Sequence, residues 1–301
     1  VLLGVVSFGM QEFFPEIQSY MILSFVIILL YLIGPVNVIL DSLPSVMRLK
    51  VAWKRVHEFI SNLEHNGNPE IETVKRKGKI DSFELKDIAF QYEAKGDVNF
   101  GIGPINLQVN SGEILFIVGG NGSGKTTLAK LLTSLYKPDS GQIFIDGMPM
   151  EGPQLGEYFS VVFSPTYLFK KLYSINVKES KEDIDKYLRI LKLDHKVFVT
   201  EEGFNTVDLS GGQRKRLALL QCFLEDAPIY LLDEWAADQD PEYRNFFYRT
   251  LLPEMRRAGK VIIAITHDDH YFDIADRVMK MNEGQLEEYV YEQPNYSLDL
   301  N

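Results

Sequence analysis

Residues 21–40 form a continuous apolar segment that contains no charged side chain. A helix of about 20 apolar residues crosses the hydrocarbon core of a bilayer, so this segment is long enough to span a membrane. The alternative is a buried core helix of a soluble protein, but such a helix usually keeps a polar stripe, which is missing here. The pattern therefore favours a transmembrane helix, in which Gly34 and Pro35 form a tolerated kink.

Charged residues on either side of this segment indicate its direction. Glu12 and Glu16 precede it, and four basic residues follow between residues 48 and 55. Because positive residues stay on the cytoplasmic side, we expect the helix to run from outside to inside and to extend into the cytoplasm over residues 43–63. Apolar residues 1–10 are too short to span a membrane and are interpreted as the end of an earlier membrane helix.

A polar segment separates this region from the rest of the chain. Residues 62–80 contain turn-forming residues and a basic run at 75–79, which fits a solvated linker near a membrane better than a nucleic-acid patch. From residue 81 to residue 301, short apolar runs alternate with turns and helical patterns. The sequence thus predicts the end of a transmembrane domain over residues 1–61, a linker, and an α/β domain.

Three apolar runs of the α/β domain are continuous rather than alternating, at residues 114–118, 229–232 and 261–265. Continuous runs are typical of strands that are buried on both faces of a parallel sheet. Further strands are predicted at 83–92 and 105–109. Since ligands bind beyond the carboxyl ends of parallel strands, we expect functional residues directly after the three continuous runs.

Composition narrows the choice of function. The net charge of −11 argues against a nucleic-acid partner, which would require a basic face. The single cysteine, Cys222, excludes a disulfide within the chain and is interpreted as a buried apolar residue. The chain begins with Val1, and together with one complete span this indicates a fragment of a larger protein.

A glycine-rich loop joins the run at 114–118 to a helical pattern. Its glycines allow several backbone N–H groups to point at one phosphate chain, and the start of the helix adds a positive dipole end. Lys125 is placed to reach the β- and γ-phosphates of a nucleotide, and the Thr126 hydroxyl to bind Mg²⁺. The residues assigned to this ATP site are Gly119, Gly120, Asn121, Gly122, Ser123, Gly124, Lys125, Thr126 and Thr127.

Two acidic residues follow the run at 229–232. Asp233 ends this predicted strand, so its carboxylate is expected beside the glycine-rich loop as a second metal ligand. Glu234 is the next residue and can act as the general base for an attacking water.

A second glycine-containing helix start, Leu209-Ser210-Gly211-Gly212-Gln213, lies between the two elements of this site. One phosphate chain does not need two such cradles from one subunit, so the second is expected to serve a neighbour's nucleotide. With this motif the chain resembles the nucleotide-binding domain of ATP-binding cassette (ABC) transporters. The resemblance implies a head-to-tail dimer, with each ATP between one glycine-rich loop and the partner's signature motif.

The resemblance assigns further roles by position. Tyr92 matches the aromatic residue that stacks on adenine, and His267, after the run at 261–265, matches the switch histidine that contacts the γ-phosphate. Asp238 lies in the loop that crosses the dimer interface. Ser164 stands where the family normally has a glutamine that binds Mg²⁺, so a serine there could contact the metal only through water.

Ser164 and the stretch from Asp233 to Pro241 resemble one branch of the family, the exporters of cyclic peptides and peptide siderophores. The predicted fold is an α/β P-loop cassette, with a parallel-sheet core and β-rich and helical subdomains, preceded by the end of an α-helical transmembrane domain. The implied function is an ATPase subunit of an exporter in the bacterial inner membrane, with the cassette in the cytoplasm and a second half-transporter subunit as partner.

The alternatives are a soluble cassette ATPase of DNA repair or translation, a regulatory module without turnover, and an importer ATPase. The charge-free run at 21–40 disfavours a soluble cassette ATPase. The fusion of this run to the cassette disfavours an importer, because importers usually carry their membrane helices on a separate chain. A binding-only module would need neither Glu234 nor His267. A homodimer is expected, but a heterodimer stays open, as do the transported molecule and the direction of transport.

Overall fold

The computed structural model describes residues 19–65, 78–92, 100–173 and 175–291 of the 301-residue chain. Contacts divide the chain into two compact units, Val1–Glu72 and Thr73–Asn301. The interpretation of residues 1–10 as the end of a membrane helix lies outside the described residues.

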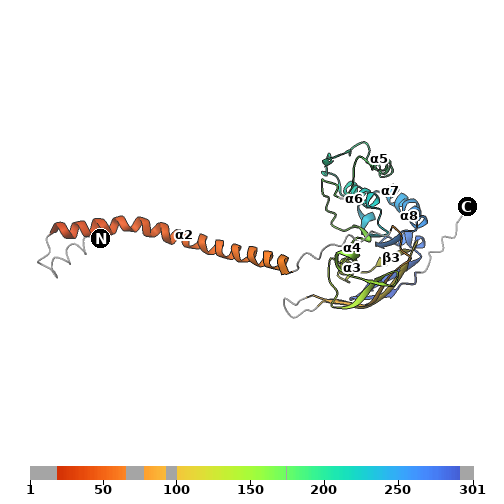
Figure 1. Ribbon diagram of the computed structural model, residues 1–301, viewed down its shortest axis with the longest axis horizontal. Helices are drawn as coiled ribbons and strands as arrows, with labels where there is room; N and C mark the ends of the chain where they lie inside the picture. The colour runs from red at the N-terminus through yellow and green to blue at the C-terminus, as the bar shows by residue number, and fades with distance from the viewer. Residues whose placement is uncertain (1–18, 66–77, 93–99, 174, 292–301) are drawn as a thin grey trace, which may run out of the picture. The chain divides into compact units, whose positions relative to one another are not determined.

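The first unit contains one long helix, α2 (Ser19–His65), drawn in red and orange in Figure 1. It includes Pro35 and Pro44 and continues into the segment that was expected to be the linker. Within the described residues, Ser24–His57 is the one stretch that is long and apolar enough to cross a membrane. Apart from Val26, the large apolar side chains that the structure describes on this helix are exposed, in contrast to those of the core helix of a soluble protein.

The second unit is built on a six-stranded sheet with the order β12-β11-β3-β10-β9-β6. The central strands are parallel, and only β12 runs antiparallel to its neighbour β11. Their bounds are Ile114–Val118 for β3, Phe159–Val162 for β6, Ile229–Asp233 for β9, Val261–Ile265 for β10, Arg277–Asn282 for β11 and Gln285–Glu288 for β12. The predicted parallel sheet is confirmed.

Both faces of this sheet are covered, which explains the continuous apolar runs. Along β3, Phe116 packs into one hydrophobic cluster, whereas its neighbours Leu115 and Ile117 pack into a second cluster on the opposite face. Every residue of β3, β9 and β10 is buried as a result. Successive side chains of a strand point to opposite faces, so a sheet between two cores requires apolar residues at each position.

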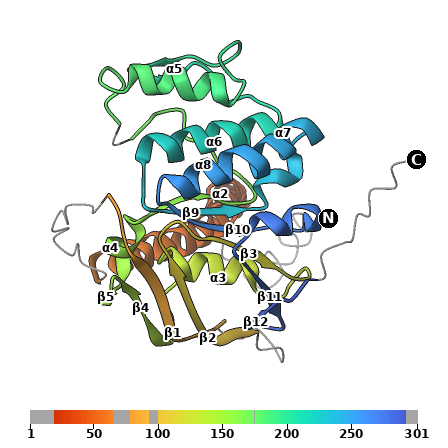
Figure 2. The same cartoon turned by 90° about the vertical axis from the view of Figure 1, so that its right-hand side faces the viewer.

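A second, antiparallel sheet lies below the first in Figure 2, with the order β2-β1-β4-β5. Its strands are β1 (Ser82–Gln91), β2 (Gly101–Asn110), β4 (Ser140–Ile145) and β5 (Met148–Met150). The helix α3 (Lys125–Leu132) lies between the two sheets, with its buried apolar residues in the cluster that they share. The glycine-rich loop before α3 is therefore held by both sheets.

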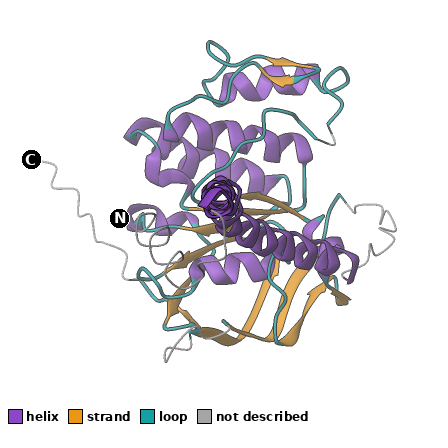
Figure 3. Ribbon diagram, turned by 90° about the vertical axis from the view of Figure 1, so that its left-hand side faces the viewer, coloured by secondary structure: helices purple, strands orange, loops and turns teal. Residues whose placement is uncertain are grey.

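Helices cover the other face of the six-stranded sheet, as Figures 2 and 3 show from opposite sides. They include α6 (Gly211–Glu225), α7 (Pro241–Phe246) and α8 (Leu252–Arg257), with a π-helical turn at Phe247–Leu251 between the last two. The outer part consists of α5 (Lys181–Ile190) and the short hairpin of β7 (Val199–Thr200) and β8 (Gly203–Phe204), and α4 (Gly152–Gly156) precedes β6.

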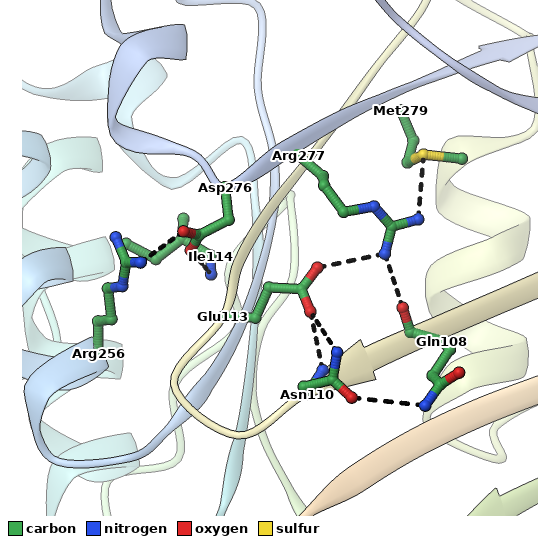
Figure 4. A network of polar contacts seen from close by, with 8 residues as sticks. All are labelled: Gln108, Asn110, Glu113, Ile114, Arg256, Asp276, Arg277 and Met279. Carbon is green, nitrogen blue, oxygen red and sulfur yellow. Dashed lines mark hydrogen bonds and ion pairs between the residues drawn. The ribbon is translucent and has the colours of Figure 1, made fainter.

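A polar network joins the two sheets where β2 turns into β3 (Figure 4). Arg277 of β11 donates to the Gln108 carbonyl of β2 at 2.8 Å and pairs with Glu113 at 3.2 Å. Glu113 in turn accepts from the Asn110 backbone N–H at 2.9 Å. These charge-assisted bonds fix the turn that leads into β3, and with it the strand that carries the glycine-rich loop.

Candidate functional site

The glycine-rich loop runs from the carboxyl end of β3 to the start of α3, and its glycines differ in the space around their Cα atoms. Gly119 and Gly124 have φ angles of 147° and 110°, and a Cβ atom would lie 2.3 Å from the Met281 carbonyl oxygen and 2.7 Å from Ile102 Cγ2, respectively. Gly120 and Gly122 instead face open space. The first pair lets the loop pack against the sheets, and the second pair leaves its inner side open to a ligand.

Polar groups of the loop are arranged for an anion. Lys125 is 7% exposed, and its Nζ donates to the carbonyl oxygens of Gly119 at 2.7 Å and Gly120 at 2.9 Å. Burial lowers the pKa of Lys125, while the nearby carboxylates of Glu234 and Asp233 oppose this shift. The Ser123 hydroxyl is buried without a hydrogen-bond partner. A phosphate chain would satisfy both groups.

Asp233 lies at the carboxyl end of β9, where it is 3% exposed. Its Oδ2 accepts a long, 3.5 Å hydrogen bond from the Ser164 backbone N–H, so the structure brings these two predicted residues together. Burial raises the pKa of the Asp233 carboxyl group, partly offset by the Ser164 bond. A buried carboxylate with one weak partner suits a cation, which would replace the missing solvation.

The described residues contain no group of three His, Cys, Asp or Glu side chains that could enclose a metal ion. The predicted Mg²⁺ would need a different kind of site, because Mg²⁺ is usually held by one or two protein oxygens together with waters and substrate phosphates. Thr126 is exposed on the first turn of α3 and Asp233 provides a carboxylate, so the oxygen donors present fit such an ion.

Glu234 and His267 face each other across the ends of β9 and β10. His267 Nε2 lies 3.6 Å from Glu234 Oε1, and both side chains are partly exposed, as groups that act on a bound substrate must be. Glu234 has a φ angle of 49°, and its backbone N–H donates to the Ile265 carbonyl at 2.9 Å. The predicted base and switch histidine thus form one polar pair.

A network behind His267 was not found by sequence reasoning. The Tyr248 hydroxyl lies 2.7 Å from Thr266 Oγ1 and donates to Asp268 Oδ2 at 2.9 Å, so it holds the residues on both sides of His267. Tyr248 belongs to the π-helical turn at Phe247–Leu251. Such turns are frequent at functional sites, but an aromatic residue in a helical pattern gives no signal in the sequence beyond core packing.

Tyr92 lies beside the glycine-rich loop, as expected for a residue that contacts a base. Its hydroxyl is 3.0 Å from Thr127 Oγ1, and its side chain remains partly exposed. The ring contacts Phe90, Phe100 and Tyr136 at centroid distances of 5.1, 6.3 and 6.0 Å. These contacts form an aromatic surface at the loop on which an adenine ring could stack.

The signature motif forms the start of α6. Ser210 is the N-cap, and it exchanges hydrogen bonds with Gln213 in a capping box, at 3.4 Å and 3.3 Å. Gln213 also accepts from Lys196 at 2.9 Å, and the Gly212 carbonyl accepts from Gln239 at 3.0 Å. Leu209 is buried, whereas Ser210 and Gly211 are exposed and remain accessible to a ligand from outside.

The comparisons with known protein sequences agree on one family. Residues 102–237 match the model of the ABC transporter family. The chain is 40% identical over 299 residues to the ATP-binding protein SyrD of Pseudomonas syringae pv. syringae, covering 94% of this chain and 52% of that protein. It is 30% identical to the ATP-dependent lipid A-core flippase of Vibrio vulnificus (strain YJ016), over 75% of this chain and 40% of that protein. The chain thus spans about half the length of these relatives or less.

Solved structures share the fold. A dimeric ATP-binding cassette in a post-hydrolysis state, bound to ADP and Pi, matches with a TM-score of 0.59 and 22% identity, over 70% of this chain and 99% of that chain. A bacterial Atm1-family ABC exporter with ATP bound matches with a TM-score of 0.58 and 23% identity, over 70% of this chain and 39% of that chain.

We predict that Asp233→Asn raises the thermal stability of the protein in the absence of nucleotide and metal. Because burial raises the pKa of Asp233, the folded protein favours the protonated form of this carboxyl group. The contribution of Asp233 to stability is therefore complete below the unfolded-state pKa of about 4 and is lost as pH rises through the folded-state pKa. The gain from Asn should therefore be present at pH 7 and vanish near pH 4. Thermal unfolding in EDTA, followed by tryptophan fluorescence, measures it.

Asp276→Asn provides a control of opposite sign. Asp276 pairs with Arg256 and accepts a hydrogen bond from the Ile114 backbone N–H at 2.9 Å, so its negative charge is well compensated. Loss of this charge should therefore lower the midpoint temperature of thermal unfolding. A lowered midpoint for Asp233→Asn at pH 7 would contradict the interpretation of Asp233 as an unsatisfied charge.

The two glycines of the signature should respond differently to alanine. A Cβ atom on Gly212 would lie 2.5 Å from the Asp238 carbonyl oxygen, whereas one on Gly211 would have its nearest neighbour at 3.7 Å. We expect Gly212→Ala to cost about 1–3 kcal/mol of unfolding free energy, because backbone must move. Gly211→Ala should be neutral or stabilising, since alanine favours helices. Equal effects in chemical denaturation would refute this contrast.

Proposed function

Because the chain carries an ATP-binding ATPase domain that belongs to the ABC transporter family, we propose that the chain is the ATP-hydrolysing part of a membrane exporter. The observation that carries the proposal is the fusion of one apolar helix, α2, to a cassette with both Glu234 and His267 at its site. An importer would usually place its membrane helices on another chain.

In the proposed reaction, Glu234 takes a proton from the attacking water, and His267 contacts the γ-phosphate and orients Glu234 through their 3.6 Å contact. Lys125 exchanges its two loop carbonyls for the phosphate chain and stabilises the charge on the transferring group. Thr126 and Asp233 would hold Mg²⁺, with Ser164 next to Asp233 as a residue that acts through water. The metal would supply neutralisation of phosphate charge.

The active assembly is proposed to be a head-to-tail dimer, in which Leu209 to Gln213 complete the partner's ATP site and Asp238 lies in the loop at the interface. The exposure of Ser210 and Gly211 supports this arrangement, because a ligand can reach them from outside the subunit. The full set of site residues is present in one chain, which supports a homodimer with two equal sites.

The proposed location is the bacterial inner membrane, with α2 in the lipid bilayer and the cassette on the cytoplasmic side. The substrate class proposed is a cyclic peptide or peptide siderophore. It is supported by Ser164 and by the stretch from Asp233 to Pro241, which resemble that branch of exporters. A soluble or regulatory ATPase is the alternative, and the exposed apolar surface of α2 disfavours it.

Glu234→Gln tests the catalytic assignment. In the full-length protein reconstituted in liposomes, we expect ATPase activity to fall by at least about a hundredfold, because a positioned base contributes roughly 10²–10⁴ to the rate. ATP binding should persist, whereas Lys125→Ala should weaken it. Glu242→Gln is the control, since Glu242 is exposed and pairs with Lys192. A normal rate in Glu234→Gln would refute the role of Glu234 as base.

Cysteine labelling tests the membrane assignment. Ile33 and Val51 are similarly exposed on α2, 51% and 55%, but only Ile33 lies in the proposed span. In a background free of other cysteines, Ile33→Cys should resist a membrane-impermeant maleimide on either side of the membrane. Val51→Cys should react only when the cytoplasmic side is open to the reagent. Equal labelling of both positions would support a soluble protein.

A further inference from the structure

Lys215 is a buried cation close to the proposed catalytic base, and it has no role in the proposed reaction. It lies on α6 just beyond the signature motif and is 4% exposed. Its Nζ donates to the Glu234 backbone carbonyl at 2.6 Å and pairs with Asp238 Oδ2 at 2.7 Å. One ammonium group therefore joins the signature helix to the base and to the loop that follows it.

A lysine at this position is costly, because burying an ammonium group removes its hydration and orders a long side chain. Filling the space would need only an apolar residue of similar length. The two short bonds recover the cost only while Glu234 and Asp238 keep their positions. Lys215 therefore favours one arrangement of these residues over others.

The backbone of Glu234 depends on such support. Its φ angle of 49° is in the left-handed region, which costs a residue with a side chain about 1–2 kcal/mol. Both of its backbone polar groups are held from outside, the N–H by the Ile265 carbonyl at 2.9 Å and the carbonyl by Lys215. The direction of the Glu234 carboxylate follows from this backbone conformation.

The same loop is attached to the beginning of α6 by two further contacts. Gln239 donates to the Gly212 carbonyl at 3.0 Å, and the Trp235 indole N–H donates to the Lys215 carbonyl at 2.9 Å. The indole also stacks on Phe247, at a centroid distance of 4.1 Å. Specific bonds, in addition to packing, therefore join α6 to residues 234–239.

We propose that Lys215 is a positioning residue that couples the signature helix to the catalytic base of the same subunit. When the start of α6 engages the partner's nucleotide, Lys215 fixes the Glu234 backbone so that its carboxylate faces the attacking water. The inference rests on the proposed function, because it takes Glu234 as the base and the signature as a contact to a second subunit.

Lys260 offers a matched control for burial of a lysine. It is 9% exposed, and its Nζ donates to the carbonyls of Asp226 and Ala227 at 3.0 and 3.1 Å and pairs with Asp226 Oδ1 at 2.7 Å. The environment resembles that of Lys215, which has one backbone carbonyl instead of two and likewise one exposed aspartate. Lys260 precedes β10, at the amino end of the sheet, so it lies at the edge opposite to Glu234.

The experiment compares Lys215→Met and Lys260→Met in the full-length protein reconstituted in liposomes. Both should lower the thermal midpoint to a similar extent. We expect only Lys215→Met to lower kcat, by about tenfold or more, as misplacement of a catalytic group does, with the KM for ATP changed less than about twofold. Lys215→Gln keeps a donor for the Glu234 carbonyl and should restore part of kcat.

A double-mutant cycle with Asp238→Asn separates the two bonds of Lys215. Asp238→Asn removes the ion pair but leaves the bond to Glu234, so its effect on kcat should be smaller than that of Lys215→Met, and the double variant should resemble Lys215→Met. If Lys215→Met does not fold, Lys215→Gln and Asp238→Asn still test the coupling, and normal kcat in both overturns it.

The outcome also separates this inference from the proposed function. If Glu234→Gln abolishes turnover and Lys215→Met has the kcat of Lys260→Met, then the positioning role is wrong and the catalytic assignment stands. If Glu234→Gln retains normal turnover, then the proposed function itself is wrong. A kcat that falls equally in Lys215→Met and Lys260→Met would indicate a structural role alone and would also overturn the inference.

Discussion

The register of three parallel strands is the constraint on which the site depends. Ile265 of β10 pairs with Ile117 of β3 on one side and with Asp233 of β9 on the other. The chain therefore leaves all three strands at the same level of one sheet edge, toward the glycine-rich loop, Glu234 and His267. A shift of one residue in any strand would also exchange its two buried faces, so the packing that stabilises the sheet also places the site.

Burial at this edge creates two charges that the protein alone satisfies incompletely. Lys125 relies on two carbonyl oxygens, and Asp233 relies on one long bond to Ser164. Burial lowers the pKa of Lys125 and raises the pKa of Asp233, so it favours the neutral form of each group. A nucleotide with a hard divalent cation has the opposite charges at each place, so the electrostatics that destabilise the empty site favour its ligands.

The parts that the sequence predicts are those in which local pattern and tertiary role agree. The runs at 114–118 and 261–265 coincide with β3 and β10, because strands between two cores are apolar at every position. The run at 105–109 is only part of β2, which begins at Gly101, since Gly103 and Pro104 interrupt the apolar pattern. Lys215 and Tyr248 were missed because a basic residue in a basic run and an aromatic residue in a helix are ordinary until tertiary contacts are known.

The contacts around the signature also bear on how one subunit would sense another in the proposed dimer. Ser210 and Gly211 are exposed, while Gly212 and Lys215, a few residues further on, are bonded to the loop that carries Glu234 and Asp238. The accessible and the internal faces of this helix start are thus separated by less than two turns of helix. When a ligand contacts the accessible face of this helix start, the position of the Glu234 carboxylate on the internal side can respond. The bonds between the helix start and the loop that carries Glu234 leave little freedom for independent movement.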